Sequence, residues 1–573
     1  MKKFRLLWVI LYFVVVTVVF TYPLVFHLMD STIGGYGDNI YFVWLIKWYQ
    51  GVIFEGKGQM FFNPWMNYPD GWNLSTTDTT VASALPGVPI SLLLGPVAGY
   101  NVAMLITFIL SGLFMYLWAR DLTKSEGAAL VAGTMFAFLP YRMAHFIIGH
   151  LNLSGTQWFP LFFFGLYRLL RSERKLDLKY ILLTALSLGA IGFTSMYYLY
   201  MTLLISGIFI ASFLVFTRFR PLRSKQFWLN AVITIVLAIP LAYMSIKPFI
   251  DLSRTGEIAS RSIEYVSMYS ASPTDFLLPA SDHFIFGAIL AKFLDRSLWI
   301  EGSLYIGLAG MVLSIIALVT AKRSEHKSFI LAAGVVILAA IVLAFGIDLH
   351  WNNQHIIWNV PQFLQPLIKR SETYLYMPSY WLFFKLPFFS SMRALMRFGV
   401  FALVFTCILS ALGFQWLSHR VIGGKRIGLT ILVIGFILFE FYPGSYASQL
   451  HQPVPRKVDL WLADQPNNGA VVQMPFEQSE DQAQLFYTIF HKKPIVGGFF
   501  NANQPAQYLR IKPIMTRFPL QDAIKELSRL GVEYIVVDSN AYENFDEIQN
   551  TIEGSGLRLL SIQDEQYVYG FAQ

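Results

Sequence analysis

The chain has little charge and almost no cysteine for its length. Asp, Glu, Lys and Arg make up 14% of its 573 residues, and hydrophobic residues make up 55%. Ordinary soluble proteins contain about 25% charged residues, so water cannot be the main solvent of this chain. The single cysteine, Cys407, lies inside an apolar run. It excludes a disulfide framework and a cysteine-based metal site.

Several signatures of chemistry are also absent. The sequence contains no glycine-rich phosphate loop, no zinc signature and no nucleophile elbow. The net charge of +8 does not indicate nucleic-acid binding, because Lys and Arg fall in short clusters between apolar runs. Such clusters are typical of the cytoplasmic loops of a membrane protein.

About eleven apolar segments have the length and composition of membrane spans. They are residues 6–28, 100–119, 127–144, 153–170, 179–193, 197–216, 227–246, 303–320, 328–345, 397–417 and 427–441. The short basic loops between alternate pairs fall on the side of the N-terminus, which the positive-inside rule places in the cytoplasm. Residues 81–98 are apolar as well, but their prolines and glycines favour a re-entrant or interfacial segment.

The predicted fold is therefore an all-α polytopic membrane protein with a small C-terminal α/β domain outside the cytoplasm. Residues 1–447 form the transmembrane domain, with large outer loops at 29–99, 247–302 and 346–396, and residues 448–573 form the α/β domain. In the latter, strand-like segments 470–474, 533–538 and 566–571 alternate with helix-like segments 480–490 and 521–530. Polar residues concentrate on the outer side, where any chemistry is expected.

The first outer loop contains Gly37-Asp38-Asn39, followed by an apolar segment with two tryptophans, residues 40–53. This segment could lie along the membrane surface as a helix. Asp38 would then stand where a lipid headgroup meets water. The alternative is that Asp38 is simply the N-cap of that helix, a common position for aspartate.

Taken together, these features resemble the GT-C superfamily of bacterial membrane glycosyltransferases, which take a sugar from a polyprenyl-phosphate carrier outside the cytoplasm. The resemblance rests on the acidic first-loop motif and on further short motifs along most of the chain: residues 63–74, Gly149-His150-Leu151-Asn152 with Pro160, Leu386-Pro387-Phe388-Phe389 with Arg393 and Arg397, residues 472–475 and residues 531–534.

The resemblance implies that Asp38 is the general base that takes a proton from the acceptor hydroxyl. Many members have a second acidic residue where this chain has Asn39. Members that bind a divalent metal have an acidic motif after the third span, where this chain has His145, His150 and Asn152. We therefore expect no required cofactor, although two histidines and one aspartate could still ligate a metal.

The leaving group of such a reaction is a lipid phosphate, whose developing charge needs fixed cations. Arg393 and Arg397 are four residues apart, so they share a face if the tenth helix begins just before them. The N-terminal end of that helix would add its positive dipole end. The alternative is that both arginines are snorkelling anchors at a helix end.

Other polar residues are weaker candidates for substrate binding. They are Asn39, Asp78, His145, His150, Asn152, Glu264, Glu301, Tyr374 and Lys385. A charged segment with Arg254, Glu257, Arg261 and Glu264 is more simply a solvated surface than an acceptor site.

The sequence favours an inverting glycosyltransferase in the plasma (inner) membrane, with a polyprenyl-phosphate-linked sugar as donor and a glycan, lipid or protein as acceptor. A transporter or flippase of lipid-linked saccharides is the first alternative. It would more often show midplane charges and related halves, and the sequence shows neither. A catalytically inactive scaffold for glycan assembly is the second, because Asp38 alone separates it from the enzyme.

Overall fold

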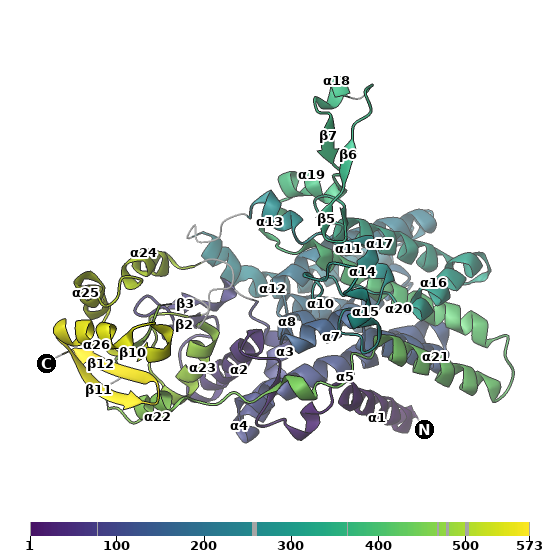
Figure 1. The fold of residues 1–573 in the computed structure, drawn as a ribbon. Coiled ribbons are helices and arrows are strands. Elements are labelled where there is room, and N and C mark those ends of the chain that lie inside the picture. The colour runs from purple at the N-terminus through teal and green to yellow at the C-terminus, as the bar shows by residue number, and fades with distance from the viewer. Residues whose placement is uncertain are drawn as a thin grey trace.

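The computed structural model of the protein describes residues 2–76, 78–254, 261–363, 365–466, 469–476, 481–498 and 504–571. Long helices form a bundle, and a small sheet with its own helices lies at one end of it (Figure 1). A hairpin, β6 (Ile357–Asn359) and β7 (Glu372–Tyr374), projects from the bundle.

The apolar helices of the bundle coincide with the segments predicted as membrane spans. They are α1 (Lys2–Phe20), α5 (Pro96–Thr123), α6 (Glu126–Ala137), α7 (Pro140–Ile147), α9 (Trp158–Leu170), α10 (Leu178–Gly192), α11 (Met196–Phe216), α12 (Lys225–Ser253), α16 (Leu308–Thr320), α17 (Lys327–Ala344), α20 (Gly399–Ser418) and α21 (Lys425–Phe441).

Within the described residues, six of these helical segments are long and apolar enough to cross a membrane by length and composition. They are Pro96–Thr123, Glu126–Ile147, Met196–Phe216, Lys225–Ser253, Lys327–Ala344 and Leu395–Ser418. The chain is thus a multi-pass membrane protein. The predicted count of about eleven is supported only in part, because helices such as α9 and α16 have 13 residues and reach about 20 Å at 1.5 Å per residue.

Glycines allow the central helices to approach one another closely. A Cβ on Gly112 of α5 would lie 2.4 Å from the Phe13 ring of α1, and one on Gly133 of α6 would lie 2.7 Å from the Gly112 carbonyl oxygen. Small residues commonly mediate helix contacts in membranes. Helix α20 is buried along its whole membrane-spanning window, so the other helices pack around it.

Short elements occupy the loops that the sequence predicts to lie outside the cytoplasm. The helices are α2 (Asp38–Glu55), α3 (Val81–Ala84), α4 (Val88–Leu94), α8 (Leu151–Ser154), α13 (Ile263–Ser267), α14 (Pro273–Leu277), α15 (Phe286–Leu290), α18 (Gln365–Ile368) and α19 (Pro378–Lys385). The strands are β1 (Thr32–Ile33), β2 (Phe62–Asn63), β3 (Trp72–Asn73), β4 (His350–Trp351) and β5 (Gln354–His355).

Helix α2 does not lie open on a membrane surface, contrary to the expectation for residues 40–53. Most of its residues from Asn39 to Gly51 are buried, because it packs between α4 and α5 on one side and α23 (Asp481–His491) on the other. Trp44 Nε1 donates a hydrogen bond to Thr488 Oγ1 at 3.1 Å. The tryptophans of this helix therefore join the bundle to the C-terminal region.

The C-terminal region contains a four-stranded sheet in the order β11-β12-β10-β9. Its strands are β9 (Ala470–Met474), β10 (Val532–Asp538), β11 (Leu557–Gln563) and β12 (Gln566–Phe571), and its other helices are α22 (Lys457–Ala463), α24 (Ala506–Met515), α25 (Gln521–Arg529) and α26 (Phe545–Gly554). Strands β9 and β10 are parallel, and the other pairs are antiparallel. The predicted strands and helices are present, and β11 was not predicted; Glu480 lies outside the described residues.

A small ladder ties this region to the first outer loop. Strand β1 pairs in antiparallel fashion with β8 (Leu450–His451), and Thr32 lies opposite His451. The loop that carries Asp38 is therefore held from both ends, by β1 before it and by α2 after it.

Candidate active site

A cavity of about 390 Å³ opens among the outer loops of the bundle. Its polar lining residues are Asp38, Asp78, His150, Asn152, Tyr197, Arg261, Tyr269, Ser297, Glu301, Arg393 and Arg397. They come from segments that are far apart in the sequence. The fold thus gathers most of the predicted candidates into one site.

Asp38 is the first residue of α2 and contacts a histidine that also lines the cavity. Its Oδ2 lies 2.8 Å from Nε2 of His150, and a quarter of the side chain is exposed (25%). The N-cap position belongs to Gly37, where no side-chain hydrogen bond caps the helix. The N-cap interpretation of Asp38 is therefore wrong.

Two glycines with positive φ bring Asp38 and His150 together. A Cβ on Gly34 (φ +82°) would lie 2.4 Å from the carbonyl oxygen of Ile147, and one on Gly149 (φ +80°) would lie 2.3 Å from the Cβ of Asn39. Only glycine permits both the left-handed backbone and this close approach. The turn between α7 and α8 can therefore press against the start of α2, with His150 next to the carboxylate.

Asn39 supports this loop and does not line the cavity. Its Nδ2 donates to Thr32 Oγ1 at 3.0 Å and to the carbonyl oxygen of Ile33 at 3.1 Å, while its Oδ1 accepts from the backbone N–H of Gly37 and Ile40. The residue is 1% exposed. A buried carboxylate here would lose both donated bonds, which explains why an amide stands in the place of a second acid.

A chain of polar contacts continues from His150 through the wall of the cavity. His150 Nδ1 lies 2.9 Å from Nδ1 of the buried His145, so one proton bridges the two rings. His145 Nε2 lies 3.9 Å from Oε2 of Glu301, and Glu301 accepts two hydrogen bonds from Arg397. A line of polar contacts thus runs from Asp38 through His150, His145 and Glu301 to Arg397.

The two other carboxylates of the cavity have pKa values shifted in opposite directions. Burial alone would raise the pKa of Glu301, but the charge and hydrogen bonds of Arg397 overcome it and lower the pKa to about 2. Burial raises the pKa of Asp78 above its ordinary value, against hydrogen bonds from Asn152 and the N–H of Met196. The cation next to Glu301 therefore stabilises its ionised form, and among the described residues Asp78 has no comparable cation beside it.

The two predicted phosphate-binding arginines both line the cavity, but they differ in their surroundings. The 3₁₀ turn η7 (Leu395–Phe398) leads into α20, so Arg393 precedes the helix and the predicted helical face does not form. Arg397 is committed to Glu301, with Nε 2.9 Å from Oε2. Arg393 donates to the Tyr269 hydroxyl and stacks on that ring at 4.4 Å.

Arg261, expected from the sequence to belong to a solvated surface segment, lines the cavity instead. Its guanidinium lies 5.4 Å from the centre of the Tyr265 ring, and it lines the cavity together with Arg393. In the described part of the chain neither guanidinium forms an ion pair with a carboxylate. Glu257 lies outside the described residues. Only the folded chain reveals that Arg261 faces the same space as Asp38.

Three of the weaker candidates lie away from the cavity. Glu264 is exposed in the first turn of α13, Lys385 is exposed at the end of α19, and Tyr374 stacks on His355 with ring centres 4.6 Å apart. His145 touches the site only through His150 and Glu301. Asp78, His150, Asn152 and Glu301 are the candidates that the fold brings to the cavity beside Asp38.

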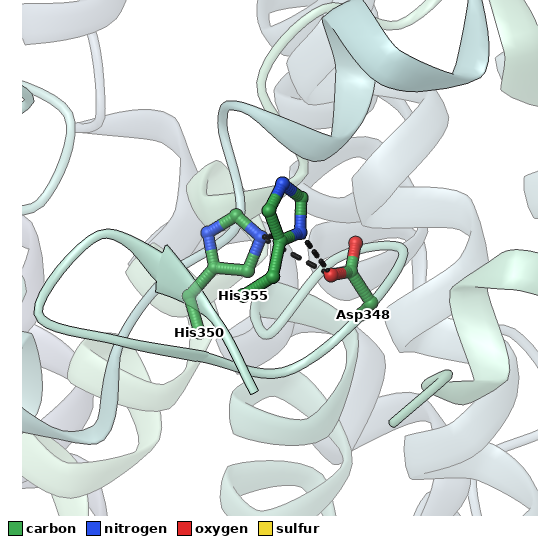
Figure 2. Close-up of side chains that lie close together, drawn as sticks. All are labelled: Asp348, His350 and His355. Carbon is green, nitrogen blue, oxygen red and sulfur yellow. Dashed lines mark hydrogen bonds and ion pairs between the residues drawn. The ribbon is translucent and has the colours of Figure 1, made fainter. Parts of the chain in front are cut away.

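One further cluster of ionisable side chains was missed by the sequence analysis. Asp348, His350 and His355 offer ligand atoms that all lie within 4.8 Å of one another (Figure 2). None of the three lines the cavity. Two histidines that flank an Asn352-Asn353 turn were the available signal.

A family model described as a domain of unknown function (DUF6311) matches residues 56–418, more than half of the chain. The chain belongs to the DUF6311 family. The region shared with the DUF6311 family begins after Asp38 and contains the cavity residues from Asp78 to Arg397. No curated protein matches the chain.

Solved structures that resemble this DUF6311 protein are GT-C glycosyltransferases. The archaeal oligosaccharyltransferase AglB of Archaeoglobus fulgidus, in complex with an inhibitory peptide and a dolichol-phosphate, aligns with a TM-score of 0.51 and 14% identity over 100% of this chain and 75% of its own. The arabinofuranosyltransferase AftD from Mycobacteria aligns with a TM-score of 0.57 and 12% identity over 100% and 42%. ArnT of Cupriavidus metallidurans, bound to undecaprenyl phosphate, aligns with a TM-score of 0.51 and 11% identity over 98% and 97%. The predicted resemblance to the GT-C superfamily is confirmed at the level of the fold.

Proposed function

We propose that the protein is a membrane glycosyltransferase that moves a sugar from a polyprenyl-phosphate carrier to an acceptor hydroxyl outside the cytoplasm. The observation that carries the proposal is the cavity itself, whose lining combines Asp38, in contact with His150, with Arg261 and Arg393. A partly exposed carboxylate suits a base, and guanidiniums without carboxylate partners in the described chain suit an anionic phosphate. AglB and ArnT with bound lipid phosphates supply the analogy.

In the proposed reaction Asp38 takes the proton of the acceptor hydroxyl while the oxygen attacks the anomeric carbon. The bond from that carbon to the phosphate oxygen breaks, and the polyprenyl phosphate leaves with the electron pair. Arg393 and Arg261 stabilise the negative charge that develops on the leaving group. A single displacement of this kind inverts the configuration of the sugar.

His150 positions the base. Its Nε2–H donates to Asp38 Oδ2 in the tautomer whose Nδ1 accepts from His145. The Asp38 carboxylate is then oriented by the His150 ring, which His145 holds through the opposite ring nitrogen. The other oxygen of Asp38 stays available to the acceptor.

The topology proposed from the sequence agrees with this site. The lining residues belong to the loops assigned to the outer side, or, as Leu153, Tyr197 and Arg397 do, to the outer ends of the adjoining spans. This supports an N-terminus in the cytoplasm and an α/β region outside. The proposed domains remain residues 1–447 and 448–573. The plasma (inner) membrane is the proposed location. The acceptor is a glycan, lipid or protein, and the transfer step requires no cofactor, although the histidines next to Asp38 could ligate a divalent metal.

The test is sugar release from polyprenyl-phosphate-linked hexoses and pentoses by purified protein in detergent. Asp38→Asn should lower the rate at least about 10²–10⁴-fold, the usual contribution of a general base, with an unchanged melting temperature. Asp30→Asn is the matched control, because Asp30 is an exposed carboxylate of the same loop outside the cavity. Wild-type turnover in Asp38→Asn would remove Asp38 from the mechanism.

A further inference from the structure

The outer loop after α17 contains a second cluster of polar side chains, distinct from the cavity. Asp348, His350 and His355 point their ligand atoms toward one another (Figure 2). Asp348 is 1% exposed and His350 is 2% exposed, while the side chain of His355 is half-open to solvent. The cluster is thus buried on one side and accessible on the other.

The backbone of a tight hairpin places the two imidazoles side by side. Strands β4 and β5 are joined by Asn352 and Asn353, which both have positive φ (54° and 61°). Such a two-residue turn matches the twist of a hairpin, and it sets His350 directly opposite His355 in the ladder. Residues in this relation have Cβ atoms about 4.5–5.5 Å apart, so both rings can reach one ion.

The distances between the ligand atoms are close to those of a coordination polyhedron. His350 Nε2 lies 3.1 Å from His355 Nδ1 and 3.3 Å from Asp348 Oδ2. Ligands about 2.0–2.1 Å from a tetrahedral Zn²⁺ stand about 3.3–3.4 Å apart. The third edge, from His355 Nδ1 to Asp348 Oδ2, is 2.5 Å and needs to lengthen by less than about 1 Å.

The charges of the cluster also favour a cation. Asp348 is a buried carboxylate, and the ion-pair partners it has in the described residues are these two histidines alone. A divalent cation binds neutral imidazoles and a carboxylate together, so one ion can contact all three groups at once.

The Asp348 carboxylate is held in place by a residue of α13, which lies close in sequence to a residue of the cavity. Ser267 donates a hydrogen bond to Asp348 Oδ1, as second-layer partners of metal ligands commonly do. Ser267 is the last residue of α13, and two residues later Tyr269 contacts Arg393 in the cavity wall. An ion bound at Asp348 would hold Ser267 and the short segment between it and Tyr269 in place.

We propose that Asp348, His350 and His355 bind a divalent transition-metal ion of the Zn²⁺ class, which clasps the outer loop against α13. Two nitrogens and one oxygen are the donor set that such ions prefer, whereas Mg²⁺ and Ca²⁺ take oxygen ligands. A water completes the coordination on the exposed side of His355. The ion is structural and lies outside the cavity, so the inference does not depend on the proposed transferase activity.

The experiment uses the full chain in detergent, purified without a polyhistidine tag and stripped with a chelator. Zn²⁺ is titrated by calorimetry and bound metal is counted after gel filtration. We expect one Zn²⁺ per wild-type chain, unaffected by millimolar Mg²⁺, and a higher melting temperature with Zn²⁺. Co²⁺ should bind in its place and give the visible absorption of a tetrahedral site.

Three variants decide the assignment. His355→Ala and Asp348→Asn should lose the bound Zn²⁺ and the thermal shift, and Ser267→Ala should weaken binding about 10-fold. His419→Ala removes an exposed histidine at the far end of α20 and should bind like wild type. His355→Ala is at a half-open position and tests the site even if Asp348→Asn folds poorly. A wild-type chain that binds no Zn²⁺, or unchanged binding in His355→Ala, overturns the proposal.

Discussion

The cavity and the outer-loop cluster are built from the same residue types, yet their geometries differ. In the cavity, His150 and His145 face each other through Nδ1. The Nε2 of His150 lies 2.8 Å from Asp38, and the Nε2 of His145 lies 3.9 Å from Glu301, beyond hydrogen-bond distance. In the loop, both histidines turn toward one oxygen of Asp348. The linear arrangement in the cavity can orient a base, whereas three lone pairs directed at one point can share one cation.

The second difference between the two regions is the presence of arginine. Glu301 has Arg397 as its counter-ion, and two further guanidiniums line the same space. Asp348 has no arginine or lysine partner in the described chain. Arg397 already compensates the buried charge of Glu301, so a metal ion would add little there. Asp348 has no such fixed cation among the described residues, so a metal ion can compensate its charge. This difference favours Asp348 over the carboxylates of the cavity as a ligand of a metal ion.

Removal of Glu301 should have the largest effect on stability, because it strands a buried charge. Glu301→Ala leaves Arg397 without an acidic partner, and breaking a buried pair costs about 3–5 kcal/mol. The free energy of unfolding is measured in detergent by tryptophan fluorescence. Glu264→Ala, at an exposed glutamate, should change it by less than about 0.5 kcal/mol. Equal effects of the two substitutions would contradict the pairing.

The same ion pair predicts the direction of a pH effect. Because the pKa of Glu301 is lowered to about 2, its stabilising contribution is complete above the ordinary value of about 4.3 and is lost as the pH falls toward 2. In Glu301→Gln this part of the acid destabilisation should disappear. The free energy of unfolding is measured against pH for the wild type and for Glu301→Gln, and the difference between the two curves is the contribution of this carboxylate.

Arg393 should matter for the lipid phosphate more than Arg397 does. Arg393 has no carboxylate partner in the described chain, so its charge is available to a ligand. We expect Arg393→Ala to lower sugar transfer about 10²-fold, as when one preorganised donor is lost, and to weaken quenching of tryptophan fluorescence by undecaprenyl phosphate. Arg220→Ala, an exposed arginine of a short loop outside the cavity, is the control. Normal lipid binding by Arg393→Ala would remove Arg393 from the phosphate site.

The sequence predicted the helices well because apolar runs are local signals. Every apolar segment proposed as a span is helical, and the strands at 470–474, 533–538 and 566–571 are present. The prediction that Asp38 and Arg393 serve one site came from the family resemblance, and the cavity contains both residues. The surroundings of helix α2 could not be predicted, because an apolar segment with tryptophans has the same sequence pattern whether lipid or protein covers it.

Contacts between distant segments could not be predicted from periodicity. Arg261 is far from Asp38 in the sequence, and Asp348 is far from Ser267. No local sequence pattern marks either pair as neighbours. The helical face expected for Arg393 and Arg397 failed because α20 starts later than the apolar pattern suggests. The role of Asn39 needed the backbone of β1, to which its amide donates.

The smallest effect is expected where a positioning residue is replaced by one that keeps its hydrogen bond. In His150→Gln the amide nitrogen can still donate to Asp38, but the bond to His145 Nδ1 is lost, so we expect sugar transfer to fall about 10-fold. His150→Ala loses both contacts and should fall about 100-fold. If His150 only orients the carboxylate, the pH profile of kcat keeps its shape in His150→Gln; if it also accepts the proton, the acid limb of that profile moves. A kcat unchanged in His150→Ala would show that Asp38 works without this histidine. The contacts of His150 with Asp38 and His145 would then be structural, like those of the Asp348 cluster.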